Sequence, residues 1–193
     1  MDKYYNETPV VSMRNITKRF GDKEVLSNIN FDLHKSEVHA LLGENGAGKT
    51  TLMNILYGMF APTDGAITIN DKTYANMTPK KAIDLGIGMV HQHFMLIEPL
   101  TVTENIILGY EEDTGLFLNR KKAREKIKDL TYEYGLDINP DSKIEDISVG
   151  QQQRVEILKA LYRGADVLIF DEPTAVLTPQ EIKEFIDIVN RLT

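Results

Sequence analysis

The chain has 193 residues, no cysteine and a formal net charge of −7 at pH 7. This length suits one domain with a sizeable core, and the lack of cysteine excludes disulfides and thiolate metal sites. The acidic balance argues against general nucleic-acid binding, and no apolar run approaches the roughly 18 residues of a membrane span. We therefore expect a soluble, cytoplasmic α/β domain.

The N-terminal part has the pattern of an antiparallel hairpin. Residues 10–20 and 24–33 mix β-branched and polar side chains on either side of Gly21 and Asp22, which are typical turn residues. Phe20 lies just before this turn. A core position is the simplest interpretation of Phe20, while packing on the turn and stacking on a base remain open.

A glycine-rich loop follows. Residues 38–42 form an apolar run that predicts a strand, and residues 49–58 have an apolar pattern that predicts a helix. The segment that joins the predicted strand to the predicted helix fits the phosphate-binding pattern G-x-x-x-x-G-K-[ST]. With the first residues of the helix it reads Gly43-Glu44-Asn45-Gly46-Ala47-Gly48-Lys49-Thr50-Thr51. Small residues let backbone N–H groups surround phosphate oxygens at the positive end of the helix. Lys49 would reach the β- and γ-phosphates, and the hydroxyl of Thr50 would ligate Mg²⁺.

The middle of the chain alternates short strands and helices. Predicted strands cover residues 66–70 and 86–91, and predicted helices cover residues 80–85, 101–108 and 119–134. The second of these strands is followed by Gln92, whose amide could ligate Mg²⁺ and orient water. His91 and His93 flank it, but we disfavour a metal pair because no third ligand is apparent.

The pattern from Ser148 to Gln151 is that of a capping box at the start of a helix. A helix N-terminus with a hydroxyl and the amide of Gly150 is also an anion site, so both interpretations stand. This segment lies far along the chain from the phosphate loop. We therefore expect it to serve a nucleotide held by a second copy of the fold.

Two adjacent acids end the last predicted strand. Residues 166–170 are apolar after the first, as in the centre of a parallel sheet, and Asp171 and Glu172 follow. Ligands bind at the carboxyl ends of such strands. Asp171 would hold Mg²⁺ and Glu172 would take a proton from the attacking water. An ordinary Asp-Glu-Pro turn is the alternative, and the upstream phosphate loop favours the functional interpretation. Thr178 to Glu181 then forms another capping box ahead of a last helix.

In this order, the motifs resemble those of the ATP-binding-cassette (ABC) ATPases across essentially the whole chain. The resemblance implies a P-loop NTPase (RecA-like) core, an N-terminal antiparallel β subdomain and a helical subdomain at roughly residues 93–163. It implies that Phe20 stacks on adenine, that residues 43–51 form the Walker A loop and that Gln92 belongs to the Q-loop. It further implies that residues 148–153 form the signature motif, residues 168–172 Walker B with its catalytic acid, and residues 175–178 the D-loop.

More narrowly, residues 91–109 and 171–181 resemble ATPases of bacterial importers for nucleosides and simple sugars. This resemblance implies Mg²⁺-ATP as cofactor, a second cassette, membrane permease subunits and, indirectly, a substrate-binding protein. The permease would dock around Phe94 to Leu100, placing the ATPase on the inner face of the cell membrane. Two other classes remain: a cassette ATPase acting on ribosomes or DNA, which the acidic charge disfavours, and a nucleotide-binding module with little turnover, which Glu172 disfavours.

The sequence departs from the family pattern at three points, and each departure predicts a structural or functional difference. Val149 replaces the first glycine of the signature motif, which predicts a negative φ there. Thr178 replaces the usual D-loop aspartate, which puts the contact with a second cassette in question. No histidine follows Glu172, whereas the family pattern continues into another strand ending in one. We therefore expect a cassette incomplete at its C-terminus, with marginal stability and low hydrolytic activity.

Overall fold

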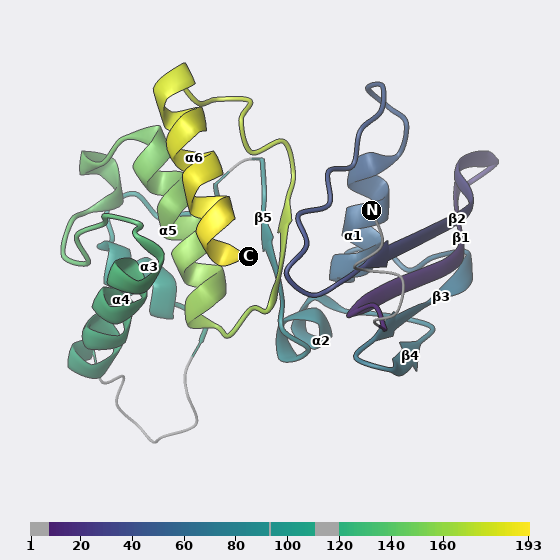
Figure 1. Ribbon diagram of the computed structural model, residues 1–193, viewed down its shortest axis with the longest axis horizontal. Helices are drawn as coiled ribbons and strands as arrows, with labels where there is room; N and C mark the ends of the chain where they lie inside the picture. The colour runs from purple at the N-terminus through teal and green to yellow at the C-terminus, as the bar shows by residue number, and fades with distance from the viewer. Residues whose placement is uncertain (1–7, 93, 111–119) are drawn as a thin grey trace. The chain divides into compact units, whose positions relative to one another are not determined.

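The computed structural model describes residues 8–92, 94–110 and 120–193. The chain divides into two compact units, Met1–Leu85 with Thr193, and Gly86–Leu192. The first unit contains the predicted hairpin and the phosphate loop. The second contains the ends of both predicted buried strands and the helices that follow them (Figure 1). The candidate site residues are therefore divided between the two units.

The first unit is built on a four-stranded antiparallel sheet in the order β2-β1-β3-β4. Its strands are β1 (Val11–Phe20), β2 (Lys23–Leu33), β3 (Asp64–Ile69) and β4 (Lys72–Tyr74). The predicted hairpin is confirmed, because β1 and β2 pair antiparallel across Gly21 and Asp22. One face is apolar and buried, and it includes Val11, Met13, Ile16, Ile67 and Ile69.

Two helices complete the first unit. The helix α1 (Lys49–Tyr57) starts at the end of the phosphate loop and buries Leu52, Ile55 and Leu56. The helix α2 (Pro79–Asp84) begins where the sequence predicts, with the Thr78 side chain accepting from the Lys81 N–H. Proline at the first helical position loses no hydrogen bond there and has a suitable φ.

The strand predicted at residues 38–42 is not formed. These residues have no regular secondary structure, and Val38 and Leu42 are 58% and 89% exposed. An apolar run becomes a strand only where a neighbouring backbone pairs with it, because its N–H and C=O groups need partners. Among the described residues, the ladders involve only β1 to β6, and none includes residues 38–42.

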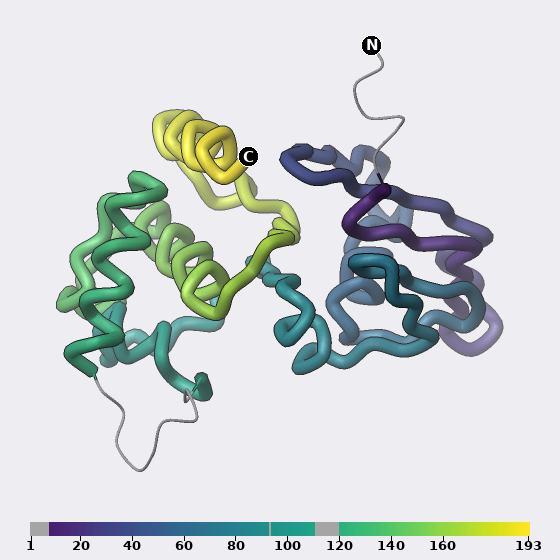
Figure 2. Tube along the Cα trace, turned by 60° about the horizontal axis from the view of Figure 1, so that its bottom comes forward, coloured from purple at the N-terminus to yellow at the C-terminus, as the bar shows by residue number. Residues whose placement is uncertain are grey.

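The second unit has two parallel strands, β5 (Ile87–Val90) and β6 (Val167–Phe170), with Val90 opposite Phe170. Its helices are α3 (Val102–Ile107), α4 (Arg120–Tyr134), α5 (Val149–Tyr162) and α6 (Pro179–Leu192), and a 3₁₀ turn, η1, covers Ile144–Asp146. The core is helical: Ile106, Ile127, Leu136, Val155, Ile157 and Leu158 are fully buried. The helix α5 contacts α3, α4 and β5, and α6 lies beside it (Figure 2).

Candidate functional site

The phosphate loop is folded around the side chain of Lys49. The Lys49 Nζ donates to the backbone carbonyls of Gly43 at 2.7 Å and Glu44 at 2.9 Å. The N–H of Ala47 donates to the Glu44 carbonyl at 3.2 Å, which closes a turn. The loop thus places its backbone beside the ammonium group of Lys49, the first residue of α1. This arrangement suits an anion, because backbone N–H groups and a lysine both favour negative charge.

Gly48 has two independent reasons to be glycine. Its φ of 92° lies in the left-handed region, where a side chain is strained. A Cβ at this position would also lie 2.6 Å from Leu26 Cδ2 and 3.2 Å from the Val25 carbonyl oxygen. Gly46 also has a positive φ, of 84°, but nothing lies within 4 Å of its Cβ position. Gly48 therefore lets the loop pack closely on β2, whereas Gly46 only permits the turn.

Phe20 is not a core residue, so the simplest sequence-based interpretation was wrong. Its side chain is 44% exposed at the end of β1. It packs edge-on against Phe60 with ring centroids 5.4 Å apart, and the Lys18 Nζ lies 4.8 Å from its ring centroid. An exposed aromatic beside a lysine offers a surface for stacking.

In the second unit, the ends of β5 and β6 bring two candidate residues into contact. The Gln92 Nε2 donates to Glu172 Oε2 at 3.1 Å, although the two residues are far apart in the sequence. The cause is the parallel pairing of the strands, extended by the Asp171 N–H, which donates to the Val90 carbonyl at 3.2 Å. Parallel neighbours end at the same edge of a sheet. The structure therefore brings together an amide and a carboxylate that the sequence placed only at the ends of two separate strands.

Glu172 has an unusual backbone conformation. Its φ is 49°, which is uncommon for a residue other than glycine, asparagine or aspartate. Such strain costs on the order of 1–3 kcal/mol and persists where the surroundings impose it. The turn directs the chain away from β6 while the Glu172 carboxylate stays beside Gln92. Sequence patterns did not signal this conformation, because glutamate has no preference for it.

The capping box predicted at the start of α5 is confirmed. The Ser148 Oγ accepts from the Gln151 N–H at 3.2 Å, and the Gln151 Oε1 accepts from the Ser148 N–H at 3.0 Å. Val149 is the first helical residue and does not have a positive φ, as its β-branched side chain requires. The amide of Gly150, in the first turn, is aimed out of the helix.

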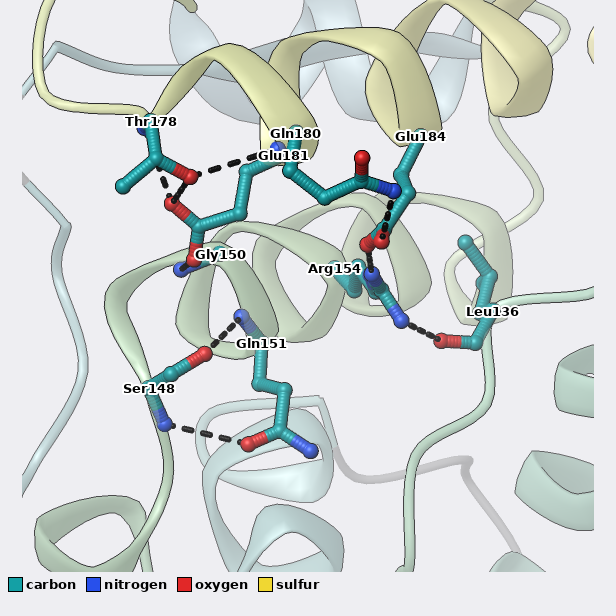
Figure 3. A network of polar contacts seen from close by, with 9 residues as sticks. All are labelled: Leu136, Ser148, Gly150, Gln151, Arg154, Thr178, Gln180, Glu181 and Glu184. Atoms are coloured by element: carbon teal, nitrogen blue, oxygen red, sulfur yellow. Dashed lines mark hydrogen bonds and ion pairs between the residues drawn. The ribbon is translucent and has the colours of Figure 1, made fainter.

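Glu181 accepts a hydrogen bond from the Gly150 N–H. The sequence predicts only a local role for Glu181, in the capping box that begins at Thr178. Its Oε1 accepts from the Gly150 N–H at 3.2 Å, and its Oε2 accepts from the N–H and hydroxyl of Thr178 at 2.9 and 2.8 Å (Figure 3). The hydrogen bonds from Thr178, chiefly that of its N–H, lower the pKa of Glu181 below its ordinary value. A Cβ on Gly150 would lie 2.5 Å from Glu181 Oε1.

One turn further along, a second polar contact joins α5 and α6. Arg154 forms an ion pair with Glu184 and donates to the Leu136 carbonyl at 3.3 Å. Gln180 donates to the other oxygen of Glu184 at 3.1 Å (Figure 3). The two helices are thus joined at two levels, by a charge pair here and by Glu181 at their N-termini.

The structure does not test the histidine metal pair that the sequence disfavours. His93 lies outside the described residues, so the pair with His91 has no described geometry. Within the described ranges there is no group of three or more histidine, cysteine, aspartate or glutamate side chains that could hold a metal ion. The predicted magnesium ligands are divided between the units, with the hydroxyl of Thr50 in the first and the amide of Gln92 and the carboxylate of Asp171 in the second.

A profile of the ABC transporter family matches residues 26–175, which is most of the chain. The chain belongs to the ABC transporter family. The fold agrees: a nucleotide-free ATP-binding cassette from an ABC transporter is similar with a TM-score of 0.82 at 26% identity, over 96% of this chain and 77% of that one. The P-loop NTPase fold predicted from the sequence is therefore confirmed, and membership implies nucleotide binding.

Two curated relatives are import proteins. The chain is 59% identical over 187 residues to the nucleoside import ATP-binding protein NupA of Lactococcus lactis, covering 97% of this chain and 37% of that protein. It is 56% identical over 183 residues to the guanosine import ATP-binding protein NupO of Bacillus subtilis, covering 95% and 36%. The chain thus spans just over a third of the length of these relatives.

A dimeric bacterial ABC transporter cassette is also similar, with a TM-score of 0.75 at 26% identity over 94% of this chain and 82% of that one. Among the described residues, every helix is too short or too polar to span a bilayer.

Proposed function

We propose that this chain is the nucleotide-binding part of an ATPase that powers the import of nucleosides or simple sugars. The contact between Gln92 and Glu172 carries the hydrolytic part of the proposal, because it joins an amide that orients water to a carboxylate that accepts a proton. The import part is supported by the relatives, whose names describe nucleoside and guanosine import.

The residues that would bind the nucleotide through its phosphates and base lie in the first unit. The loop amides of Asn45, Gly46, Ala47 and Gly48, with those of Thr50 and Thr51, would donate to the phosphates. Lys49 would exchange its bonds to the Gly43 and Glu44 carbonyls for phosphate oxygens. Phe20, exposed at the end of β1, would stack on the base.

The oxygen donors fit a magnesium ion. A hydroxyl, an amide carbonyl and a carboxylate, from Thr50, Gln92 and Asp171, are ligands that Mg²⁺ accepts alongside phosphate oxygens and water. Gln92 uses its amide nitrogen on Glu172, so its carbonyl oxygen is the atom for the metal. When bound, Mg²⁺ would neutralise charge that develops on the transferred phosphoryl group.

Hydrolysis would then rest on Glu172. The carboxylate would take a proton from the attacking water while Gln92 holds that water in line with the γ-phosphate. The strained turn at Glu172 fixes where the carboxylate lies, so that little rearrangement is needed in the reaction.

A second cassette would complete the site. Ser148, Gly150 and Gln151 of one cassette would close over the γ-phosphate bound by Lys49 of the other, because the N–H groups at a helix N-terminus favour an anion. Glu181 now accepts from Gly150. Phosphate binding at this amide therefore requires that the Glu181 carboxylate move away.

The remaining partners would lie at the membrane. Permease subunits would dock on residues 94–100, where Met95 and Ile97 are exposed apolar side chains. The assembled ATPase would lie on the inner face of the cell membrane and serve a substrate-binding protein indirectly through the permease.

Uptake by the reconstituted importer tests the proposal. The full-length protein with its permease subunits and substrate-binding protein would be placed in liposomes with ATP inside and labelled guanosine or ribose outside. ATP-dependent accumulation of either is the expected result. Full ATPase activity without accumulation of any nucleoside or pentose would contradict the import role.

A further inference from the structure

Glu156 is a buried carboxylate that none of the nucleotide motifs uses. It lies on α5, two turns after the capping box, and is only 4% exposed. An ionised carboxylate removed from water costs several kcal/mol unless it is paired and hydrogen-bonded. The partners of Glu156 therefore indicate which structural role the buried carboxylate has.

The two oxygens of Glu156 have different partners. Oε2 is paired with the Lys159 Nζ at 2.7 Å, one turn along the same helix. Oε1 accepts from the backbone N–H of Met95 at 2.7 Å, across a long sequence separation. Lys159 neutralises the charge, and the remaining acceptor ties α5 to the segment that follows Gln92.

A second buried polar side chain holds the same segment further along. Asn105 of α3 is 4% exposed. Its Oδ1 accepts from the Ile97 N–H at 2.7 Å, and its Nδ2 donates to the carbonyls of Ile97 and Thr101, both at 3.1 Å. The segment has no regular secondary structure here, so these side chains replace the ladder bonds that a strand would have.

The side chains along this segment alternate between core and surface. Met95 is 71% exposed and Ile97 is 44% exposed, whereas Leu96 packs against the helical core. The backbone N–H groups of both exposed residues donate to buried side chains, that of Met95 to Glu156 and that of Ile97 to Asn105. The chain thus presents two apolar side chains on an anchored backbone.

From this geometry we propose that Glu156 is a positioning residue that links residues 94–100 to α5, whose N-terminus carries the signature motif. A permease docked on Met95 and Ile97 would act on α5 through one buried hydrogen bond rather than through the intervening chain. The inference rests on the proposed function, since it assigns the partner on residues 94–100 to the permease. It adds the residue through which docking reaches the nucleotide site.

The test compares three versions of the full-length protein assembled with its permease subunits. Glu156→Met with Lys159→Met removes the buried pair together, so that no unpaired charge is left in the core. Glu156→Gln keeps an oxygen acceptor for the Met95 N–H. Lys143→Met with Glu145→Met removes an exposed ion pair of the same kind and is the matched control.

The measurements are the stimulation of ATPase activity by the permease, the KM for ATP and hydrogen exchange at the Met95 amide. We expect the Glu156 and Lys159 double variant to lose about fivefold or more of the stimulation. Its KM for ATP should stay within about twofold of wild type, since a positioning residue outside the nucleotide site does not hold ATP. Exchange at Met95 should become faster. Glu156→Gln should retain most of the stimulation, and the control should resemble wild type.

The possible failures are distinct. If the wild-type protein is not stimulated by the permease, the proposed function fails. If wild type and the double variant are stimulated equally while exchange at Met95 has increased, the bond exists but carries no coupling, and this inference alone fails. Loss of stimulation in Glu156→Gln to the same extent as in the double variant would also overturn it, because the acceptor would then not be the deciding feature.

Discussion

The side-chain amide of Gln92 donates to the carboxylate of Glu172 over 3.1 Å, joining the ends of two parallel strands. The contact ties Glu172 to a residue that lies just after β5, which ends at Val90. The segment that follows Gln92 is in turn held by Glu156 through the Met95 backbone. Hydrogen bonds thus join Gln92 to the proposed base, Glu172, and the Met95 backbone to α5.

The first prediction concerns the proposed base. Glu172→Gln should leave ATP binding within about twofold of wild type but lower turnover at least about 100-fold, because the amide cannot accept the proton. The carbonyl oxygen of the substituted side chain can still accept from Gln92, so the local structure is kept. Steady-state ATPase rates of the assembled importer check this, with Asp187→Asn on the exposed side of α6 as the control. Turnover near the wild-type rate in the Glu172 variant would exclude Glu172 as the base.

The second prediction concerns the cation of the loop. Lys49→Ala should weaken Mg-ATP binding by roughly tenfold to a hundredfold, the range expected for a charge-assisted hydrogen bond. Calorimetric titration measures the dissociation constant. Lys23→Ala, at the exposed start of β2, removes the same charge from the first unit and should bind ATP as wild type does. Equal affinity in both variants would remove Lys49 from the phosphate site.

The third prediction separates two demands on glycine. Gly46→Ala and Gly48→Ala both place a side chain at a positive φ, so both should lower the free energy of unfolding. Only the second also meets the Leu26 side chain and the Val25 carbonyl. It should therefore cost about 1–3 kcal/mol more than the first, as overpacking does. Urea unfolding provides the comparison, and equal losses would show that the loop can move away from β2.

Much of this fold followed from local patterns. The hairpin, the caps at Thr78 and Ser148, and the apolar strand before Asp171 each depend on a few neighbouring residues, so the sequence alone predicts them. The placement of Gln92 and Glu172 at the ends of two apolar strands also followed, but their direct contact did not, because it depends on the pairing of those strands.

Features set by distant contacts were missed. Residues 38–42 have the composition of a strand, but a strand needs a partner that composition does not supply. Phe20 has the residue type of a core position, but its ring lies exposed against Phe60, which is distant in the sequence. The roles of Glu181 and Glu156 depend on backbone N–H groups 31 and 61 residues away, and no spacing rule connects such pairs.

The fourth prediction concerns the second cassette. Ser148→Arg should reduce ATP-dependent dimerisation and the ATPase rate, because a bulky cation would replace the small hydroxyl where a phosphate must fit. Asn190→Arg adds the same charge at an exposed position of α6 and is the control. Light scattering of the Glu172→Gln background with and without ATP gives the dimer fraction. Unchanged dimerisation and hydrolysis in the Ser148 variant would contradict the head-to-tail arrangement.

The last prediction follows from the charge of Glu181. Hydrogen bonds from Thr178 and Gly150 favour the ionised carboxylate, so the pKa of Glu181 lies below its ordinary value of 4.5 in the folded chain. A lowered folded-state pKa means that the folded state binds the proton less readily than the unfolded state does. The resulting stabilisation is fully present above the ordinary value. It is lost as the pH falls from there through the folded-state pKa.

Glu181→Gln should therefore reduce stability at neutral pH and flatten the fall in stability below about pH 5, since glutamine does not titrate. Urea unfolding at a series of pH values between about 3 and 7 measures the slope. Asp187→Asn removes one carboxylate from the exposed side of the same helix and controls for the loss of charge alone. Because Gly150 would be released from a competing anion, Glu181→Gln should also strengthen ATP-dependent dimerisation. If the free energy of unfolding of Glu181→Gln falls as steeply below about pH 5 as that of wild type, Thr178 and Gly150 do not stabilise the ionised form of Glu181.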